Sequence, residues 1–347
     1  MGCERVARTD PETGVKILQL TSFPITHWHL GLGDFITPDG ERLLIAANRF
    51  AGRNSPRDLY SIRANGDDFH FLLHDFSGGV ICPRGQWVHT GCAGAVVRIP
   101  IEGGNAEVLW NPGCYTHIMV SARSSDGLWL FGQGRRKADG CFDIVRISTE
   151  TGESSVIIRA SYVMPVLRGS ANGERLVASI APVGDDGKPL MPWGVWDFSS
   201  EGEGSDFRLV PFSRSTNHYC PMGSSGLVVT TATHPGNALD VAAPGGSERV
   251  LAHGAGFWHV SSDETGTWLA SDTNWPDVGL QIVNSKTGNY ATLCMTGASG
   301  GHPQWTHAHP VISPDARWVL FTSDRTGFQH VYLADIPPEF KKVLSAP

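Results

Sequence analysis

A repeat with a period in the mid-forties runs through most of this 347-residue chain and constrains its fold more than any other feature. Each copy reads as an apolar run, a short turn and a second apolar run, as in "FITPDGERLLIAANR" and "VISPDARWVLFTSDR". A period of this length, built from short β-type segments, is typical of propellers. The turns are separated by 45, 42, 46, 53, 40 and 50 residues and lie at Gly40, Gly85, Gly127, Gly173, Gly226, Gly266 and Ala316.

Most repeats continue into a second hairpin, as in "DLYSIRANGDDFHFLLH" and "VYLADIPPEFKKVL". Alternation such as Val145-Arg146-Ile147 favours strands with one buried face. Four strands in each of seven repeats predict an all-β protein, a single seven-bladed β-propeller domain over residues 1–347 with four-stranded antiparallel blades. Residues 14–22 read as a further outer strand, which we expect to complete the last blade, close the ring and cover its exposed edges.

Composition narrows the possible partners and location of the protein. The net charge is −7 and no long run of Lys or Arg is present, so nucleic-acid binding is not favoured. No apolar run is long enough to span a membrane. The N-terminus lacks the apolar core of a secretory signal and the seven cysteines are scattered, which predicts a cytoplasmic protein with reduced thiols. The oligomeric state does not follow from the sequence.

Histidines recur where the first strand of a repeat begins. The predicted blades start near residues 29, 77, 117, 165, 218, 259 and 309. Ser77 and Pro165 occupy two of these positions, and the other five hold His29, His117, His218, His259 and His309. Propellers bind ligands at the ends of their central channel, so we expect these side chains to converge at one mouth. Clustered imidazoles are typical of metal or catalytic sites, because they supply neutral nitrogen ligands and bases that titrate near neutrality.

The stretch "QWTHAHP" predicts a metal site within that cluster. His307 and His309 are two residues apart, so in a strand both imidazoles face the same side and can share an ion. Gln304 offers an amide oxygen just upstream, and His259 on the neighbouring blade is a fourth candidate ligand. Such a set suits Mn²⁺, Fe²⁺, Ni²⁺ or Zn²⁺. The alternative is that Gln304 and His307 only hydrogen-bond the backbone of a tight loop.

The segment "QWTHAHPVISPDARWVLFTSDRTGFQHVYLADIP" resembles the C-terminal part of the oligogalacturonate lyases, which carry Q-x-x-H-x-H-P followed by V-L-F-T-S-D and Y-L-A-D. The N-terminal run "DPETGVKILQLTS" is also similar to theirs. The resemblance implies a seven-bladed propeller that cleaves short galacturonides, which are acidic oligosaccharides, by β-elimination. It implies a divalent cofactor, typically Mn²⁺ with Ca²⁺ also possible, on His259, Gln304, His307 and His309, and it makes His218 the base.

The chain departs from the family pattern in its fourth repeat. Where the family has an arginine that helps the reaction, this sequence has Trp193 or Gly194. The family's His-Pro opening of the fourth blade is here Met164-Pro165. Arg168, three residues later, is a candidate replacement, with a surface ion pair as the alternative. These changes leave the predicted metal ligands in place and put the identity of the uronate in doubt.

Other polar and aromatic residues have more than one interpretation. His29 and His117 are candidate substrate contacts or alternative bases. Arg49 occupies the same repeat position as Arg325, and we expect it to brace neighbouring blades or, second, to bind a sugar carboxylate. Trp258 precedes His259, and because neighbours in a strand face opposite ways, we expect it to pack between blades.

Three functions therefore remain open at this stage. The first is a metal-dependent lyase acting on short uronic-acid-containing oligosaccharides. The second is another uronate-linked glycoside lyase or hydrolase on the same scaffold, using His29 or His117. The third is a non-catalytic propeller that binds a ligand or a protein, although such a binder does not need the full Gln and His set.

Overall fold

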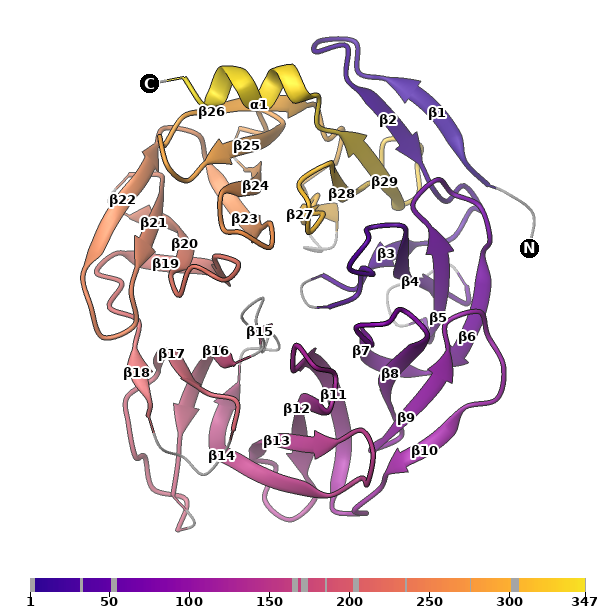
Figure 1. Ribbon diagram of the computed structural model, residues 1–347, viewed down its shortest axis with the longest axis vertical. Coiled ribbons are helices and arrows are strands. Elements are labelled where there is room, and N and C mark those ends of the chain that lie inside the picture. The colour runs from indigo at the N-terminus through magenta and orange to yellow at the C-terminus, as the bar shows by residue number, and fades with distance from the viewer. Residues whose placement is uncertain are drawn as a thin grey trace.

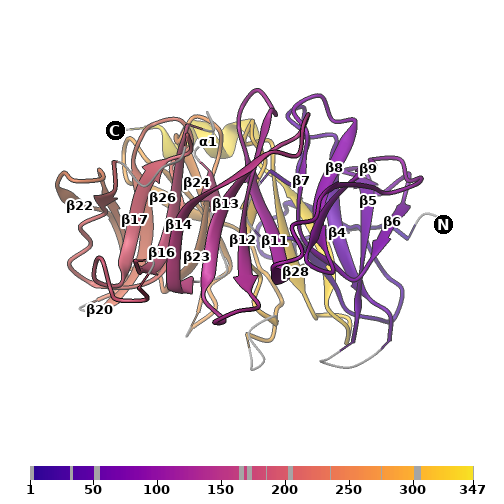
Figure 2. The same cartoon turned by 90° about the horizontal axis from the view of Figure 1, so that it is seen from below.

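Strands dominate the structure, which is a computed structural model. It describes residues 4–31, 34–50, 55–163, 168–169, 174–184, 186–201, 206–234, 236–274, 276–300 and 306–346. The sheets stand around a common centre in a propeller-like arrangement (Figure 1), and their strands run roughly along its axis (Figure 2). The prediction of an all-β protein built from small antiparallel sheets is confirmed.

Repeats one, five and six each form a separate four-stranded antiparallel sheet, with strands in sequence order. In repeat one the strands are β3 (His27–His29), β4 (Arg42–Asn48), β5 (Arg57–Arg63) and β6 (His70–His74). Repeat five has β19 (Ser215–Pro221), β20 (Val228–His234), β21 (Ala238–Ala242) and β22 (Glu248–His253). Repeat six has β23 (Phe257–Ser262), β24 (Trp268–Thr273), β25 (Leu280–Asn284) and β26 (Tyr290–Cys294).

The sheets of repeats two to four are joined into one twelve-stranded sheet. Repeat two has β7 (Phe76–Ile81), β8 (Trp87–Cys92), β9 (Ala95–Pro100) and β10 (Glu107–Trp110). Repeat three has β11 (Tyr115–Arg123), β12 (Trp129–Arg136), β13 (Phe142–Ser148) and β14 (Ser154–Val163). Repeat four has β15 (Arg168–Gly169), β16 (Arg175–Pro182), β17 (Gly194–Ser199) and β18 (Arg208–Leu209).

Two contacts make these junctions. One is the antiparallel pairing of β14 with β16, and the other is the parallel pairing of β7 with β11, where Gly78 lies opposite Val120. The second junction depends on glycine, because a Cβ on Gly78 would lie 2.1 Å from the carbonyl oxygen of Val120.

Repeat seven shares its sheet with the N-terminal segment. The strand order is β1 (Val6–Thr9), β2 (Lys16–Gln19), β29 (His330–Asp335), β28 (Trp318–Ser323) and β27 (Val311–Ile312). β2 lies inside residues 14–22 and pairs antiparallel with β29, Ile17 opposite Ala334. β1 adds a fifth, fully exposed strand that the sequence did not predict.

The predicted last strand of repeat seven is wrong. Residues 338–344 of "VYLADIPPEFKKVL" form a helix, α1 (Pro338–Leu344), instead of completing a hairpin. Pro338 suits the first turn of a helix, because its φ is already fixed and its missing N–H has no intrahelical partner there. Glu339 in the first turn, with Lys341 and Lys342 in the last, complements the helix dipole.

The apolar core is divided among layers between neighbouring sheets. One layer combines Val229 and Leu239 of repeat five with Phe257, Val260 and Leu269 of repeat six, all at most 1% exposed. A second joins repeats six and seven, and a third joins repeats seven, one and two. Each sheet is therefore fixed by its neighbours in the chain, which places the ends of the innermost strands at the centre. Among the described residues, no helix has the length and apolar character needed to cross a membrane.

Candidate active site

Four of the innermost strands are irregular near the end where they begin. The pairing register shifts after Ser77 in β7, before His117 in β11, before His218 in β19 and after Phe257 in β23. Such β-bulges re-aim side chains that a regular pleat would send to alternate faces. They lie at the repeat positions that hold Ser77, His117, His218 and His259.

Four imidazoles gather at this end of repeats five to seven, and we call His218, His259, His307 and His309 the histidine cluster. His259 is central, with its ring centroid 4.2 Å from that of His218, 3.8 Å from that of His309 and 5.7 Å from that of His307. The centroids of His307 and His309 are 6.0 Å apart. Sequence positions up to 91 residues apart thus meet at one place.

Each ring in the cluster has one nitrogen within hydrogen-bond distance of a carbonyl or carboxylate oxygen, which can only accept a hydrogen bond. The Nδ1 of His218 lies 2.9 Å from the carbonyl oxygen of Trp258, and that of His309 lies 3.0 Å from the carbonyl oxygen of His307. The Nε2 of His307 lies 3.1 Å from the carbonyl oxygen of Gly300. The Nδ1 of His259 lies 2.8 Å from a carboxylate oxygen of Asp272. Each of these nitrogens therefore carries a proton, which leaves the lone pair of a neutral ring on the other nitrogen.

The surroundings hold His309 in its neutral form. Desolvation and the neighbouring His259 lower its pKa to about 3. Its φ of +46° is in the left-handed region, which is unusual for a residue with a side chain and indicates that the backbone is held there by its contacts. At neutral pH this ring is a ligand or base and not a cation.

His29 lies beside the cluster but has a different tautomer. Its Nδ1 accepts a hydrogen bond from the backbone N–H of Gly31 at 3.0 Å, so the proton of the neutral ring is on Nε2. Burial, followed by the proximity of His309, lowers the pKa of His29 to about 3. The ring stacks on Phe35 with centroids 5.8 Å apart.

His117 is placed elsewhere on the rim. Its side chain is exposed, and its Nε2 lies 2.7 Å from the hydroxyl of Ser77, the residue at the same position of repeat two. Burial of part of the ring lowers its pKa. The structure joins His117 to Ser77, and no contact between His117 and the histidine cluster is found in the described part of the chain.

The donor chemistry of the cluster fits a divalent cation, although a complete site is not assembled. Within the described residues, no three His, Cys, Asp or Glu side chains are close enough to hold a metal ion. Two imidazoles that share an ion at ~2.1 Å would have centroids roughly 4.5–5.5 Å apart. The separations found here, 3.8, 5.7 and 6.0 Å, lie on either side of that range, so the rings would have to shift to share an ion. His259, His307 and His309 each have one ring nitrogen fixed by a hydrogen bond, so their other nitrogens are suitable ligand atoms. The predicted fourth ligand, Gln304, lies outside the described residues.

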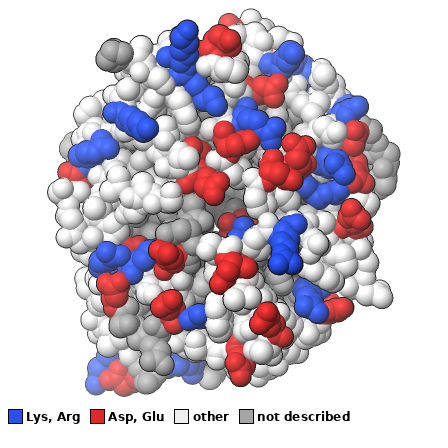
Figure 3. All heavy atoms as spheres, in the orientation of Figure 1, with Lys and Arg blue, Asp and Glu red and all other residues white. Residues whose placement is uncertain are grey.

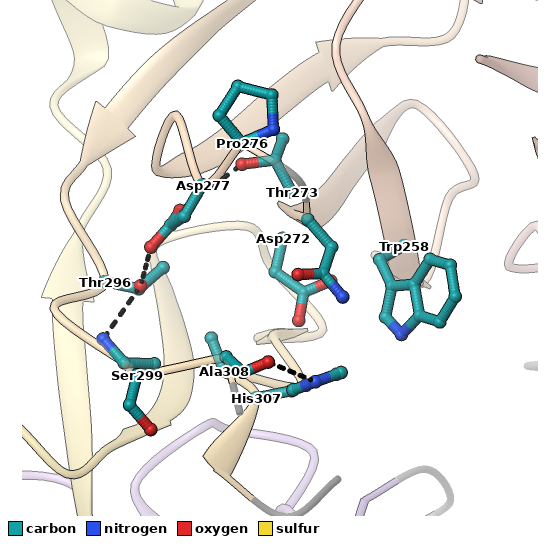
Figure 4. Close-up of a pocket in the computed structure, with 12 residues that line it drawn as sticks. Trp258, Asp272, Thr273, Pro276, Asp277, Thr296, Ser299, His307 and Ala308 are labelled. Carbon is teal, nitrogen blue, oxygen red and sulfur yellow. Dashed lines mark hydrogen bonds between the residues drawn. The ribbon is translucent and has the colours of Figure 1, made fainter. Parts of the chain in front are cut away.

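A cavity of about 150 Å³ opens beside this cluster, between the loops of repeats six and seven. Trp258, Asp272 and His307 line it together with hydroxyl and amide side chains (Figure 4). Trp258 stands edge-on to His307, with centroids 6.2 Å apart. The cavity combines an aromatic face with polar groups, which is the usual lining of a small-molecule site.

A second cavity of about 460 Å³ lies at the opposite ends of the innermost strands. Asp34, Arg123 and Glu264 are among its lining residues. The face in Figure 3 is hollowed near its centre, and its acidic and basic side chains are interspersed, without a broad basic area on the part of this face that the structure describes.

Two known proteins are similar to this chain in sequence. An oligogalacturonate lyase of Dickeya dadantii is 27% identical over 224 residues, which are 57% of this chain and 56% of that protein. An oligogalacturonide lyase of Pectobacterium atrosepticum is 33% identical over 97 residues, which are 23% of this chain and 25% of that protein. The matches thus span about half and a quarter of these relatives. No family model matches the chain.

Two solved structures share the fold over nearly the whole length. An oligogalacturonate lyase in complex with manganese has a TM-score of 0.78 at 20% identity, with 97% of each chain covered. The oligogalacturonate lyase of Vibrio parahaemolyticus has a TM-score of 0.79 at 19% identity, with 98% of each chain covered. The sequence matches and the shared fold agree. The chain is therefore similar to oligogalacturonate lyases in sequence over part of its length and in fold over nearly all of it.

The histidine cluster contains four of the predicted residues, His218, His259, His307 and His309. Arg168 lies in β15, but its side chain is outside the described residues, as are Met164 and Pro165. At the position of the family arginine, Trp193 is 61% exposed.

The two repeat-related arginines form contacts within the protein. Arg49 pairs with Asp58 at 2.6 Å and with Asp75 at 3.0 Å. Arg325 of repeat seven donates to the backbone carbonyls of Met295 and Thr296. Arg325 therefore links the segment after β26 to its own sheet, while Arg49 links the second strand of repeat one to two carboxylates nearby.

Two residues of this site have contacts that the sequence did not reveal. Trp258 was expected to pack between blades, and its ring does lie near residues of repeats five and seven, but the bulge after Phe257 also places it among the histidines, with its centroid 5.6 Å from that of His218. No motif marks Asp272, which lies in the second strand of repeat six. Its one distinguishing feature, a carboxylate in the second apolar run of a repeat, is visible only when the repeats are aligned.

Proposed function

We propose that this protein is a metal-dependent lyase that cleaves short uronic-acid-containing oligosaccharides by β-elimination. The histidine cluster carries the proposal, because four rings, each with one nitrogen fixed by a hydrogen bond, supply both ligands and a base at one place. The relatives named oligogalacturonate lyases favour an acidic galacturonide as substrate. The solved relative in complex with manganese favours Mn²⁺ as the ion.

In this proposal His259, His307 and His309 hold the ion, with Gln304 as the fourth ligand. A divalent ion there would supply positive charge against the C6 carboxylate and against the charge that develops on it. His218 is assigned the base role, because its Nδ1–H is bound to the carbonyl of Trp258 and its lone pair is on Nε2. That nitrogen takes the C5 proton, the electron pair forms the C4–C5 double bond, and the C4–O bond breaks. The departing sugar oxygen takes up a proton, and no water is consumed.

We also infer that the ring has seven blades and that β2 closes it. Support comes from the seven repeats, from the pairing of β2 with β29, and from apolar layers that link successive sheets. This arrangement would bring the starts of all innermost strands to one mouth, where a short oligosaccharide can reach the cluster.

The rival that uses His29 or His117 is less well supported. His29 carries its proton on Nε2 and accepts a hydrogen bond at Nδ1, so neither nitrogen is placed as a base. The Nε2 of His117 is engaged with Ser77, away from the cluster.

The decisive experiment is incubation of the purified protein with galacturonate oligomers, followed by the ultraviolet absorbance of the 4,5-unsaturated product. We expect product with Mn²⁺ present, none after chelation, and recovery when Mn²⁺ is returned. Saturable binding of the oligomers with no product at any metal concentration would instead identify a binding protein.

A further inference from the structure

Asp272 makes contacts that the proposed reaction does not by itself require. The residue lies in β24 and is 3% exposed. One carboxylate oxygen accepts the backbone N–H of His259 at 2.6 Å. The other accepts the Nδ1–H of His259 at 2.8 Å and the backbone N–H of His309 at 3.1 Å. One side chain thus receives three donors from segments of two neighbouring repeats.

The two backbone donors are ones that the β-structure leaves unused. The N–H of His259 lies in the bulge between Phe257 and Val260, where the ladder with β24 is interrupted. The N–H of His309 belongs to a residue at φ +46°, just before β27 begins. The carboxylate replaces the missing strand partners at both places. It thereby fixes the backbone positions from which the side chains of His259 and His309 extend.

The same position in the other repeats shows that the fold does not demand a carboxylate there. Asp272 follows its turn glycine by six residues. The residues six beyond the other turns are Ala46, Gly91, Gln133, Ser179, Ala232 and Thr322. Burying a charged carboxylate is costly unless it is well paired, so its presence in repeat six alone calls for a local reason.

We propose that Asp272 is a positioning residue that sets the tautomer of His259 and ties His259 to His309, so that both rings present lone pairs to one ion. The inference rests on the proposed metal site and extends it to a residue that does not bind the ion. A carboxylate bonded to a ligating imidazole fixes the orientation of the ring and raises its basicity. Because Asp272 also holds the backbone of His309, it couples ligands from repeats six and seven.

The test compares Asp272→Asn with wild type by titrating chelator-treated protein with Mn²⁺ alone. Asparagine has the same shape, but only its Oδ1 can accept, so it cannot receive the donors on both sides of the Asp272 carboxylate. We expect Mn²⁺ affinity to fall by about 10- to 100-fold, with the far-ultraviolet dichroism of a β-protein retained. Equal affinity in the two proteins would overturn the proposal.

A matched control is Asp240→Asn. Asp240 is a fully buried carboxylate of β21 that pairs with Arg214. This variant should lose stability and keep Mn²⁺ affinity. If it loses as much Mn²⁺ affinity as Asp272→Asn, the effect is general destabilisation and the positioning role is wrong.

A second measurement does not depend on a folded variant or on turnover. The ¹⁵N shifts of the His259 ring in metal-free wild-type protein should show the proton on Nδ1. A proton on Nε2 would reject the positioning role. Absence of lyase activity on every uronate would contradict the proposed function. The tautomer of His259 and the Mn²⁺ titration would still test the positioning role of Asp272 independently.

Discussion

Histidines occupy equivalent positions in the two halves of this chain, yet their surroundings give them different chemistry. In repeats five to seven each ring donates to a carbonyl or carboxylate and keeps its lone pair on the opposite nitrogen. In repeat one the Nδ1 of His29 accepts a hydrogen bond, and in repeat three His117 is bound to Ser77. The position within a repeat brings a side chain to the mouth, and the partner of its second nitrogen decides what it can do there.

The largest expected effect tests the histidine that we propose as the base. His218→Ala should reduce product formation by ~10²- to 10⁴-fold, the usual worth of a general base, with Mn²⁺ content unchanged. The rate of product formation and metal analysis measure the two quantities. His117→Ala is the matched control, since it removes a histidine from the same repeat position and should leave the rate close to wild type. Equal losses in both variants would contradict the assignment of His218.

Removal of the metal tests the cluster as a whole. Chelation should abolish turnover and lower the melting temperature, because an ion bound only by the folded state stabilises it by about 2.7 kcal/mol at 100 times its Kd. Calorimetry with and without Mn²⁺ measures the shift. His29→Ala should show the same Mn²⁺-dependent shift as wild type, whereas His259→Ala should show none. A metal-independent melting temperature in wild type would argue against the site.

A smaller effect distinguishes His29 from His117 by how the free energy of unfolding changes as the pH is lowered. The pKa of His29 is about 3 in the folded protein and near 6.5 when unfolded, so the unfolded chain binds the extra proton. The contribution of His29 to stability is therefore complete above pH 6.5 and is lost as the pH falls toward 3. In chelator-treated protein, His29→Gln should remove a slope of about 1.4 kcal/mol per pH unit between these limits. Denaturant unfolding at several pH values measures it, and His117→Gln should change the slope less.

The smallest expected effect concerns Arg49. Its pairs with Asp58 and Asp75 are partly exposed, and such pairs contribute little to stability. Arg49→Ala should therefore lower the free energy of unfolding slightly and leave KM for galacturonate oligomers unchanged. A large rise in KM at unchanged stability would assign Arg49 to the substrate instead of to the framework.

Local patterns predicted those parts of the fold that local physics controls. Turn residues at φ near +70°, such as Gly40 and Gly266, are visible in the sequence because few other residues adopt that conformation. The alternation of apolar residues predicted the strands between the turns. Helix α1 was missed because its seven residues are too few to show a helical period, and the strong β pattern just before it suggested another strand.

The site was predictable only in part, for a related reason. His218, His259 and His309 could be found by counting from each turn, and His307 by its spacing from His309. Trp258 could not, since alternation assumes a regular pleat and the bulge in β23 breaks it. Asp272 could not either, because its role depends on contacts with residues 13 and 37 positions away, which no local pattern encodes.

The pairing of β2 with β29 has a consequence for how the protein is made. Ile17 leaves the ribosome 317 residues before its partner Ala334. Until then β2 has no neighbour on that side, and the sheet that begins just after His309 is incomplete. The histidine cluster can therefore take its final form only when nearly all of the chain has been synthesised, so a truncated translation product would lack a working site even though His218 and His259 were already present.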